Sequence, residues 1–158
     1  MDINKATLEA LIKEILEERL IARLPNDLLR NKQSTTDGII CVKIPNIKVN
    51  EKDRLDTKNA RDKVYTKDVL SLEESQRLGC GIMEMTDTTF DWTLNYDEID
   101  YIVEGSLSIL MNGQTVTAGP GELIFIPKGS QIKFSVTGYS RFIYITYPAN
   151  WKEKESIE

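Results

Sequence analysis

The sequence predicts an all-β barrel or sandwich that follows one short amphipathic helix. After residue 38 the apolar residues gather in short runs of β-type composition, separated at hairpin spacing. Asn112-Gly113, between two of these runs, is a signal for a type I′ turn, and the stretch 118–121, Ala-Gly-Pro-Gly, is a second sharp corner. Such turns favour antiparallel pairing. The predicted strands are 39–44, 78–85, 99–103, 107–111, 123–126, 132–136 and 142–147.

The beginning of the chain has the period of a helix instead. Apolar side chains recur every three or four positions from Leu8 to Leu20, and charged residues cover the opposite face. Asn4 or Thr7 can cap the start, and Pro25 marks the end because proline cannot continue a helix. The apolar stripe consists of Leu8, Leu11, Ile12, Ile15, Leu16 and Leu20.

These patterns divide the chain into four parts. Residues 1–25 form the predicted helix, 26–38 a polar linker, 39–151 the barrel domain and 152–158 a polar C-terminal tail. Within the barrel domain, the charged stretch 50–68 is expected to be an exposed excursion. A length of 158 residues suits one domain with a short appendage and leaves no room for two enzymatic domains.

Composition excludes several classes of function. A net charge of -5 argues against nucleic-acid binding, which depends on clustered lysine and arginine. The two cysteines, Cys41 and Cys80, are too few and too far apart for a disulfide framework or a Cys-x-x-Cys metal site. No apolar run has the length of a membrane span, and no signal peptide is recognisable. We therefore expect a cytoplasmic protein with no membrane partner.

Two motifs carry a resemblance to a known fold family. Glu98 is followed after six residues by Gly105, and Gly121 is followed after five residues by Pro127-x-Gly129. This spacing resembles the first and second motifs of the cupins. The glycines suit turns with positive φ, and Pro127 can end a strand because no ladder donor is needed there. The resemblance implies a cupin fold, the double-stranded β-helix or jelly-roll barrel.

The histidines that hold the metal in typical cupins are missing. The resemblance places the His-x-His pair between Asp91 and Leu94 and the second-motif histidine at Ile132, but the chain contains no histidine. Without imidazole ligands, we expect no iron, zinc, nickel or copper site. The oxygenase and isomerase chemistry of metal-bearing cupins is correspondingly disfavoured.

Glu98 and Asp100 are the candidate catalytic residues. Strand alternation puts both on one face, and the ligand role of Glu98 in cupins makes that the inner face. Two close carboxylates repel each other, so one can titrate high and act as an acid or base, or both can hold a hard cation such as Mg²⁺. The alternative is a structural barrel in which tyrosine, lysine or arginine satisfies both acids.

Other residues are candidates for a substrate pocket. Trp92, Tyr96 and Tyr101 can line it, although aromatic residues in barrels are more often simple core. Basic residues that can face a phosphate are Lys128, Lys133 and Arg141, and surface solvation explains them equally well. The chain has no Gly-x-x-x-x-Gly-Lys-Ser/Thr phosphate loop.

A closer resemblance is carried by longer runs. Residues 92–101, 121–130, 141–144 and 148–151 are similar to the EutQ proteins of ethanolamine utilisation. This resemblance implies a homodimer that works in or beside a bacterial microcompartment. It also implies acetate kinase activity, in which ATP and acetate give ADP and acetyl phosphate. Mg²⁺ with ATP would be the expected cofactor, and Glu98 and Asp100 could hold it.

In that setting the stripe from Leu8 to Leu20 resembles the encapsulation peptides that direct cargo into microcompartments. Such a helix is too short to be stable alone and would bind a shell or cargo protein through its apolar face. The alternative is a helix that docks on its own barrel or in a dimer contact. Two other functions remain open, a non-catalytic assembly or cargo-organising factor and a small-molecule-binding cupin.

Overall fold

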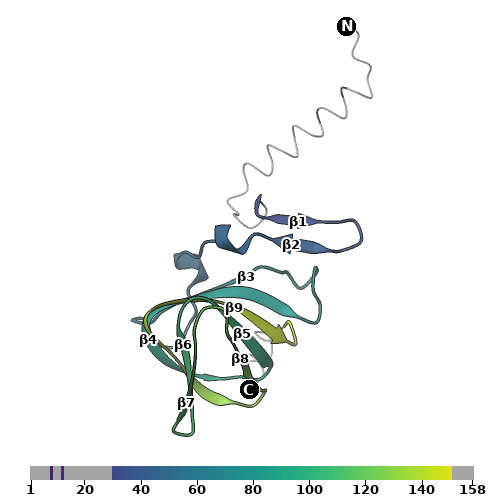
Figure 1. Cartoon of the computed structure of the whole chain (residues 1–158). Coiled ribbons are helices and arrows are strands. Elements are labelled where there is room, and N and C mark those ends of the chain that lie inside the picture. Colours follow the sequence, from purple (N-terminus) through teal and green to yellow (C-terminus); the bar gives the residue numbers. More distant parts are fainter. Residues whose placement is uncertain (1–7, 9–11, 13–29, 151–158) are drawn as a thin grey trace. The chain divides into compact units, whose positions relative to one another are not determined.

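The computed structural model describes Leu8, Ile12 and residues 30–150, shown in colour in Figure 1. Apart from Leu8 and Ile12, the predicted helix and encapsulation peptide lie outside the described residues, as does the predicted tail 152–158. The chain divides into two compact units, Met1–Lys48 and Val49–Glu158. No helix among the described residues has the length and apolar character needed to cross a membrane.

The described part of the first unit is a small hairpin. Strand β1 (Lys32–Ser34) pairs antiparallel with β2 (Ile40–Val42), and the short 3-10 helix η1 (Ile44–Asn46) follows. The turn is closed by the Ile39 N–H, which donates to Thr35 Oγ1 at 3.1 Å. Part of the predicted linker is therefore a strand, and the run 39–44 belongs to this hairpin instead of the barrel. The sequence gives no signal for this hairpin, because most side chains of β1 and β2 are exposed and do not alternate between apolar and polar.

The second unit contains a seven-stranded antiparallel sheet that curves into a barrel (Figure 1). The strand order is β3-β4-β9-β5-β8, and β6 pairs with both β9 and β7. A 3-10 helix, η2 (Glu51–Asp53), precedes the barrel. The predicted all-β architecture is confirmed, except that the predicted excursion 50–68 ends in a strand. The barrel strands are β3 (Lys63–Asp68), β4 (Gly79–Thr93), β5 (Asp97–Gly105), β6 (Leu107–Met111), β7 (Gln114–Ala118), β8 (Leu123–Ile126) and β9 (Gln131–Tyr147).

Inward side chains from all these strands form one apolar core. Leu55 and Trp92 are partly buried and pack against it. The turn at Asn112 and Gly113 has φ values of 52° and 76°, as a type I′ turn requires. Gly105 has a φ of 73°, and a Cβ there would lie 1.9 Å from the Tyr139 carbonyl oxygen. The glycine of the first motif is therefore required by both conformation and space.

Candidate functional site

The buried acids of β5 form the centre of the barrel interior. Glu98 is 4% exposed and Asp100 is 0% exposed, and both belong to the inward row of the strand, as predicted. In the sheet register Glu98 lies opposite Thr146 of β9, and Asp100 lies opposite Tyr144. We call Glu98 and Asp100 together the acid pair.

Burial controls the protonation of the acid pair. Desolvation raises the pKa of Glu98 to about 7, although hydrogen bonds to Asp100 and Tyr96 act in the opposite direction. Desolvation also raises the pKa of Asp100 well above its usual range, and the neighbouring charge of Glu98 adds to this rise. The pair therefore favours states in which at least one carboxyl group keeps its proton, and that group can donate to the other.

A short hydrogen-bond chain connects the pair to the barrel mouth. The Trp92 indole Nε1–H donates to Tyr96 Oη at 2.9 Å, and Tyr96 in turn hydrogen-bonds the Glu98 carboxyl group. Trp92 and Tyr96, both predicted to line a pocket, also line the cavity beside Glu98. The structure thus brings four of the predicted site residues together: Trp92, Tyr96, Glu98 and Asp100.

The space beside the acid pair is very small. The cavity has a volume of about 10 Å³, whereas ligand sites typically have several hundred. Such a cavity holds at most about one water molecule. Leu55, from the segment before β3, closes it on one side. The barrel interior in this conformation therefore admits neither a nucleotide nor acetyl phosphate.

The interior also fits Mg²⁺ poorly. Mg²⁺ requires near-octahedral oxygen coordination and usually keeps several of its waters. Among the described residues, no group of three or more Asp, Glu, Cys or His side chains is placed to hold a metal ion. A two-carboxyl donor set beside a one-water cavity does not supply the missing ligands. We therefore derive no reaction step through a metal held by Glu98 and Asp100.

Sequence reasoning missed a second polar group beside the pair. Tyr144 Oη donates to Asp68 Oδ1 at 2.5 Å, and burial raises the pKa of the Tyr144 phenol. The ring needs the space above Gly81, where a Cβ would lie 2.1 Å from Tyr144 Oη. Period-two alternation along β9 gives the signal that could have found Tyr144 and Thr146, because both share a face with the buried Phe142.

The other predicted pocket residues do not meet the acid pair. Tyr101 points outward and is 43% exposed, since it alternates with Asp100. Arg141 also belongs to the outward row of β9, where it is buried and forms an ion pair with Glu84. Lys128 is exposed, and its backbone N–H donates to Asp97 Oδ1 at 2.8 Å. Lys128 and Arg141 therefore do not lie beside the acid pair, and the role of the basic residues toward a phosphate stays a prediction.

Lys133 lies instead on a separate groove of about 620 Å³. Its Nζ lies 2.5 Å from Asp91 Oδ1, and both side chains reach solvent. The groove, which we call the outer groove, is formed by the ends of β4 and β9 and by the β6–β7 turn. Its lining residues are Asp91, Trp92, Thr93, Leu110, Met111, Asn112, Gly113, Gln114, Thr115, Gln131, Ile132 and Lys133.

The outward side of β5, β8 and β9 is apolar and exposed. Ile99 of β5 lies between Phe125 of β8 and Ile145 of β9 in the register, so these side chains form one continuous row. We call this surface the outer face. It comprises Ile99, Tyr101, Val103, Leu123, Phe125, Ile145 and Tyr147, which are between 36% and 60% exposed.

Comparison with known proteins gives the family. The family model described as ethanolamine utilisation protein EutQ matches residues 3–153. A Clostridioides difficile (strain 630) protein named "Acetate kinase EutQ" is 57% identical over 151 residues, covering 95% of each chain. A Salmonella typhimurium (strain LT2) protein with the same name is 34% identical over 158 residues, covering 91% of this chain and 69% of its own.

Solved structures agree with this result. The Clostridium difficile EutQ structure matches with a TM-score of 0.76 and 61% identity, over 78% of this chain and 90% of that one. The cupin domain of Schizosaccharomyces pombe Cnp3 matches with a TM-score of 0.54 at 12% identity, over 73% and 79% of the chains, which shows the fold alone. The predicted cupin fold is confirmed, and the chain belongs to the family of the ethanolamine utilisation protein EutQ.

Proposed function

We propose that this chain serves ethanolamine utilisation by transferring a phosphoryl group between ATP and acetate. The observation that carries the proposal is the name "Acetate kinase EutQ" of a relative that is 57% identical over 95% of this chain. In line with the family, we place the protein in the cytoplasm, in or beside a bacterial microcompartment.

The chemistry of this reaction indicates what kind of site it needs. A carboxylate oxygen of acetate forms a bond to the γ-phosphorus of ATP, and the bond from that phosphorus to the β–γ bridging oxygen breaks, which releases ADP. Acetate is already ionised at neutral pH and needs no general base. Because both reactants are anions, the site must supply positive charge and alignment. A buried acid pair supplies neither.

The outer groove suits these reactants better than the barrel interior. Its volume of about 620 Å³ lies within the usual range for ligand sites. Lys133 offers an ammonium group to a phosphate, and the amides of Asn112 and Gln131 offer further donors. In this proposal Mg²⁺ arrives bound to ATP. Asp91, the present partner of Lys133, would have to exchange that contact for a solvent contact when nucleotide binds.

The test compares the two locations directly. Purified protein is assayed for acetyl phosphate from acetate, ATP and Mg²⁺, beside Lys133→Met, Glu98→Gln and the matched control Lys128→Met. We expect kcat/KM to fall about tenfold or more in Lys133→Met, as for loss of a charged contact to phosphate. Lys128→Met and Glu98→Gln should stay within about twofold of the wild type. Loss of turnover in Glu98→Gln with Lys133→Met unchanged would move the reaction into the barrel.

A second candidate function is non-catalytic, that of an assembly or cargo-organising factor. It is favoured by the filled barrel and by the outer face, where large apolar side chains that are between 36% and 60% exposed form one continuous row instead of standing singly. A row of this kind can pack against the same row of another protomer, so we propose a second copy of this chain as its occupant. Absence of turnover in the wild type would favour this candidate.

The apolar stripe at the start of the chain provides the contact to shell or cargo in either case. Leu11→Glu combined with Ile15→Glu removes the centre of the stripe. We expect the variant to lose co-purification with microcompartment shells, whereas Glu14→Gln on the charged face should retain it. Shell association that persists in the double variant would show that another surface makes the contact.

A further inference from the structure

Polar atoms without partners mark the barrel interior as an incomplete site. Glu98 Oε1, both carboxyl oxygens of Asp100 and Thr146 Oγ1 are buried, and apart from the contact of the two acids with each other they accept no hydrogen bond from the described residues. A buried polar group left in this state costs about 1–3 kcal/mol. Three of these four atoms are carboxyl oxygens, so the group that complements them is a hydrogen-bond donor with positive charge.

The walls of the cavity favour the same kind of guest. Phe90, Trp92, Tyr96, Phe134 and Tyr144 line it together with Glu98. Aromatic ring faces attract cations, and no lysine or arginine is among the described residues that line the cavity. An anion such as acetate or phosphate would meet a carboxyl group and aromatic rings. The interior thus selects for a cation with a small apolar part.

Leu55 occupies the position from which such a guest would enter. It lines the cavity and packs on the core while remaining partly exposed. Its backbone N–H donates to the Val64 carbonyl oxygen at 2.9 Å, so the segment lies along the edge of β3. A leucine side chain is similar in size to a short alkylammonium ion. Outward movement of Leu55 would therefore free space of the required size.

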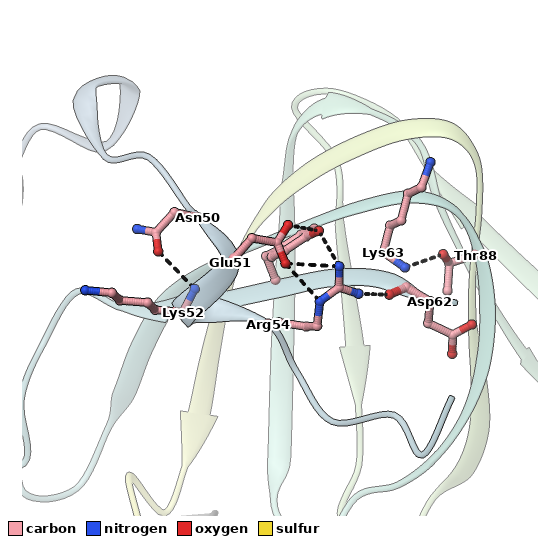
Figure 2. A network of polar contacts seen from close by, with 8 residues as sticks. Asn50, Glu51, Lys52, Arg54, Asp62, Lys63 and Thr88 are labelled. Carbon is pink, nitrogen blue, oxygen red and sulfur yellow. Dashed lines mark hydrogen bonds and ion pairs between the residues drawn. The ribbon is translucent and has the colours of Figure 1, made fainter. Parts of the chain in front are cut away.

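The segment that carries Leu55 is held by several polar contacts, among them those of Arg54 and an ion pair of Asp53 with Lys67 of β3 at 3.8 Å. Figure 2 shows the Arg54 guanidinium group at the centre of a polar network, with contacts to Glu51 and to the backbone of Asp62. Arg54 Nη1 lies 2.6 Å from the Asp62 carbonyl oxygen, and the guanidinium carbon lies 5.1 Å from the Tyr65 ring centre. We call residues 50–62 the strap. Glu51 and Asp62 belong to the strap itself, and the strap is held on β3 by the contact of Arg54 with Tyr65, the Leu55–Val64 hydrogen bond and the Asp53–Lys67 ion pair.

We propose that the barrel interior binds a short primary alkylammonium ion, which enters when the strap moves and Leu55 leaves the mouth. The ammonium group donates to Glu98 Oε1, and the negative charge of the acid pair balances it. The alkyl part takes the place of Leu55 against Phe90 and Phe134. Ethylammonium is the simplest probe of this class, and protonated ethanolamine, the compound in the family's name, belongs to the same class.

Calorimetry and thermal unfolding of the full chain test this proposal. Ethylammonium chloride and ethanolamine hydrochloride should raise the melting temperature, while 1-propanol and sodium acetate should not. Leu55→Ala should bind ethylammonium at least tenfold more tightly, because the entrance is already open. Glu98→Gln should bind at least tenfold more weakly, and the matched control Glu104→Gln, an exposed acid on the same strand, should bind as the wild type does.

Glu98→Gln could weaken binding by disturbing the fold, so Leu55→Trp provides a second test. It blocks the entrance while leaving both acids in place, and it should abolish ethylammonium binding. The proposal is overturned if neither wild type nor Leu55→Ala binds ethylammonium at millimolar concentration, if potassium chloride gives the same shift, or if Glu98→Gln binds unchanged. Lys133→Met should retain full ammonium binding, so this result is independent of phosphoryl transfer in the outer groove.

Discussion

Strand β5 has its acidic side chains on the inward side and its apolar side chains on the outward side, the reverse of an ordinary half-buried strand. The inward side carries Glu98 and Asp100, at 4% and 0% exposure, before Ile102. The outward side carries Ile99, Tyr101 and Val103, which are between 36% and 43% exposed. In most antiparallel sheets the apolar side faces the core and the polar side faces solvent. In β5 the inward side buries two acids and the outward side exposes apolar side chains, and folding alone explains neither.

This difference marks the two surfaces of β5 that folding of the barrel leaves energetically unsatisfied. Burying two carboxyl groups with most of their oxygens unsatisfied destabilises the barrel, and an exposed row of large apolar side chains favours association. Binding would remove both costs. An ammonium ion would complement the acid pair inside the barrel, and a second copy of the chain would cover the outer face. The three predictions that follow alter the inner side, its charge and the outer side in turn.

Gly81→Ala should have the largest effect, because it breaks the packing of the inner side. Its new Cβ would lie 2.1 Å from Tyr144 Oη and 2.6 Å from the Lys67 carbonyl oxygen. We expect the free energy of unfolding to fall by about 3 kcal/mol or more, measured by urea denaturation. The control Gly119→Ala, whose Cβ would meet Glu122 Oε2 at 3.7 Å, should change stability little. Equal losses in both variants would refute this packing argument.

The charge of the inner side should make stability depend on pH. Because folding raises the pKa of Glu98 from 4.5 to about 7, the folded state holds more protons than the unfolded chain between these values. The contribution of Glu98 to the free energy of unfolding should therefore be largest below pH 4.5. It should fall by roughly 3 kcal/mol as the pH rises through about 7.

The double variant Glu98→Gln, Asp100→Asn should lose most of this dependence of the free energy of unfolding on pH, whereas Glu104→Gln should keep it. Denaturant titrations at several pH values measure the effect. The raised pKa of Asp100 acts in the same direction, so this group adds to the loss of stability as pH rises. A slope that is unchanged in the double variant would assign it to other groups.

The outer side should yield the smallest effect, about 2 kcal/mol in association. Phe125, 57% exposed, lies next to Ile99 in the register of the outer face. Phe125→Glu should weaken a homodimer by about thirtyfold, as expected for an interface anchor, measured by light scattering over a concentration series. Val116→Glu, at an equally exposed residue of β7, is the matched control and should leave the dimer intact. A wild-type monomer at high concentration would remove the outer face from consideration.

The sequence predicted the centre of the site better than its surroundings. Motif spacing and strand alternation together placed Glu98 and Asp100 inside, because both rules act locally along one strand. The same alternation excludes Tyr101 from the interior, and the assignment of Tyr101 to the pocket overlooked this. Alternation along β9 likewise puts Arg141 on the face opposite Phe142 and Tyr144, but its buried ion pair with Glu84 depends on the pairing of β9 with β4, which no local pattern reveals.

The closure of the barrel could not be predicted at all. Leu55 is an isolated apolar residue within a charged stretch, and nothing near it in the sequence indicates that it meets Phe90 and Phe134. Its position depends on the path of the strap along β3, which the contact of Arg54 with Tyr65 and the hydrogen bond of Leu55 with Val64 help to determine. A site of this kind is visible only when the chain is folded.

Strand β9 has a consequence for how the protein is made. It pairs with β4, β5 and β6, and so it joins three separate pieces: β3 with β4, β5 with β8, and β6 with β7. It is also the last of the described strands to leave the ribosome. Until it arrives, the three pieces have open edges and no common core, which is the condition in which nascent β-proteins aggregate or recruit chaperones. We therefore expect a vulnerable interval during synthesis that ends when β9 has been made.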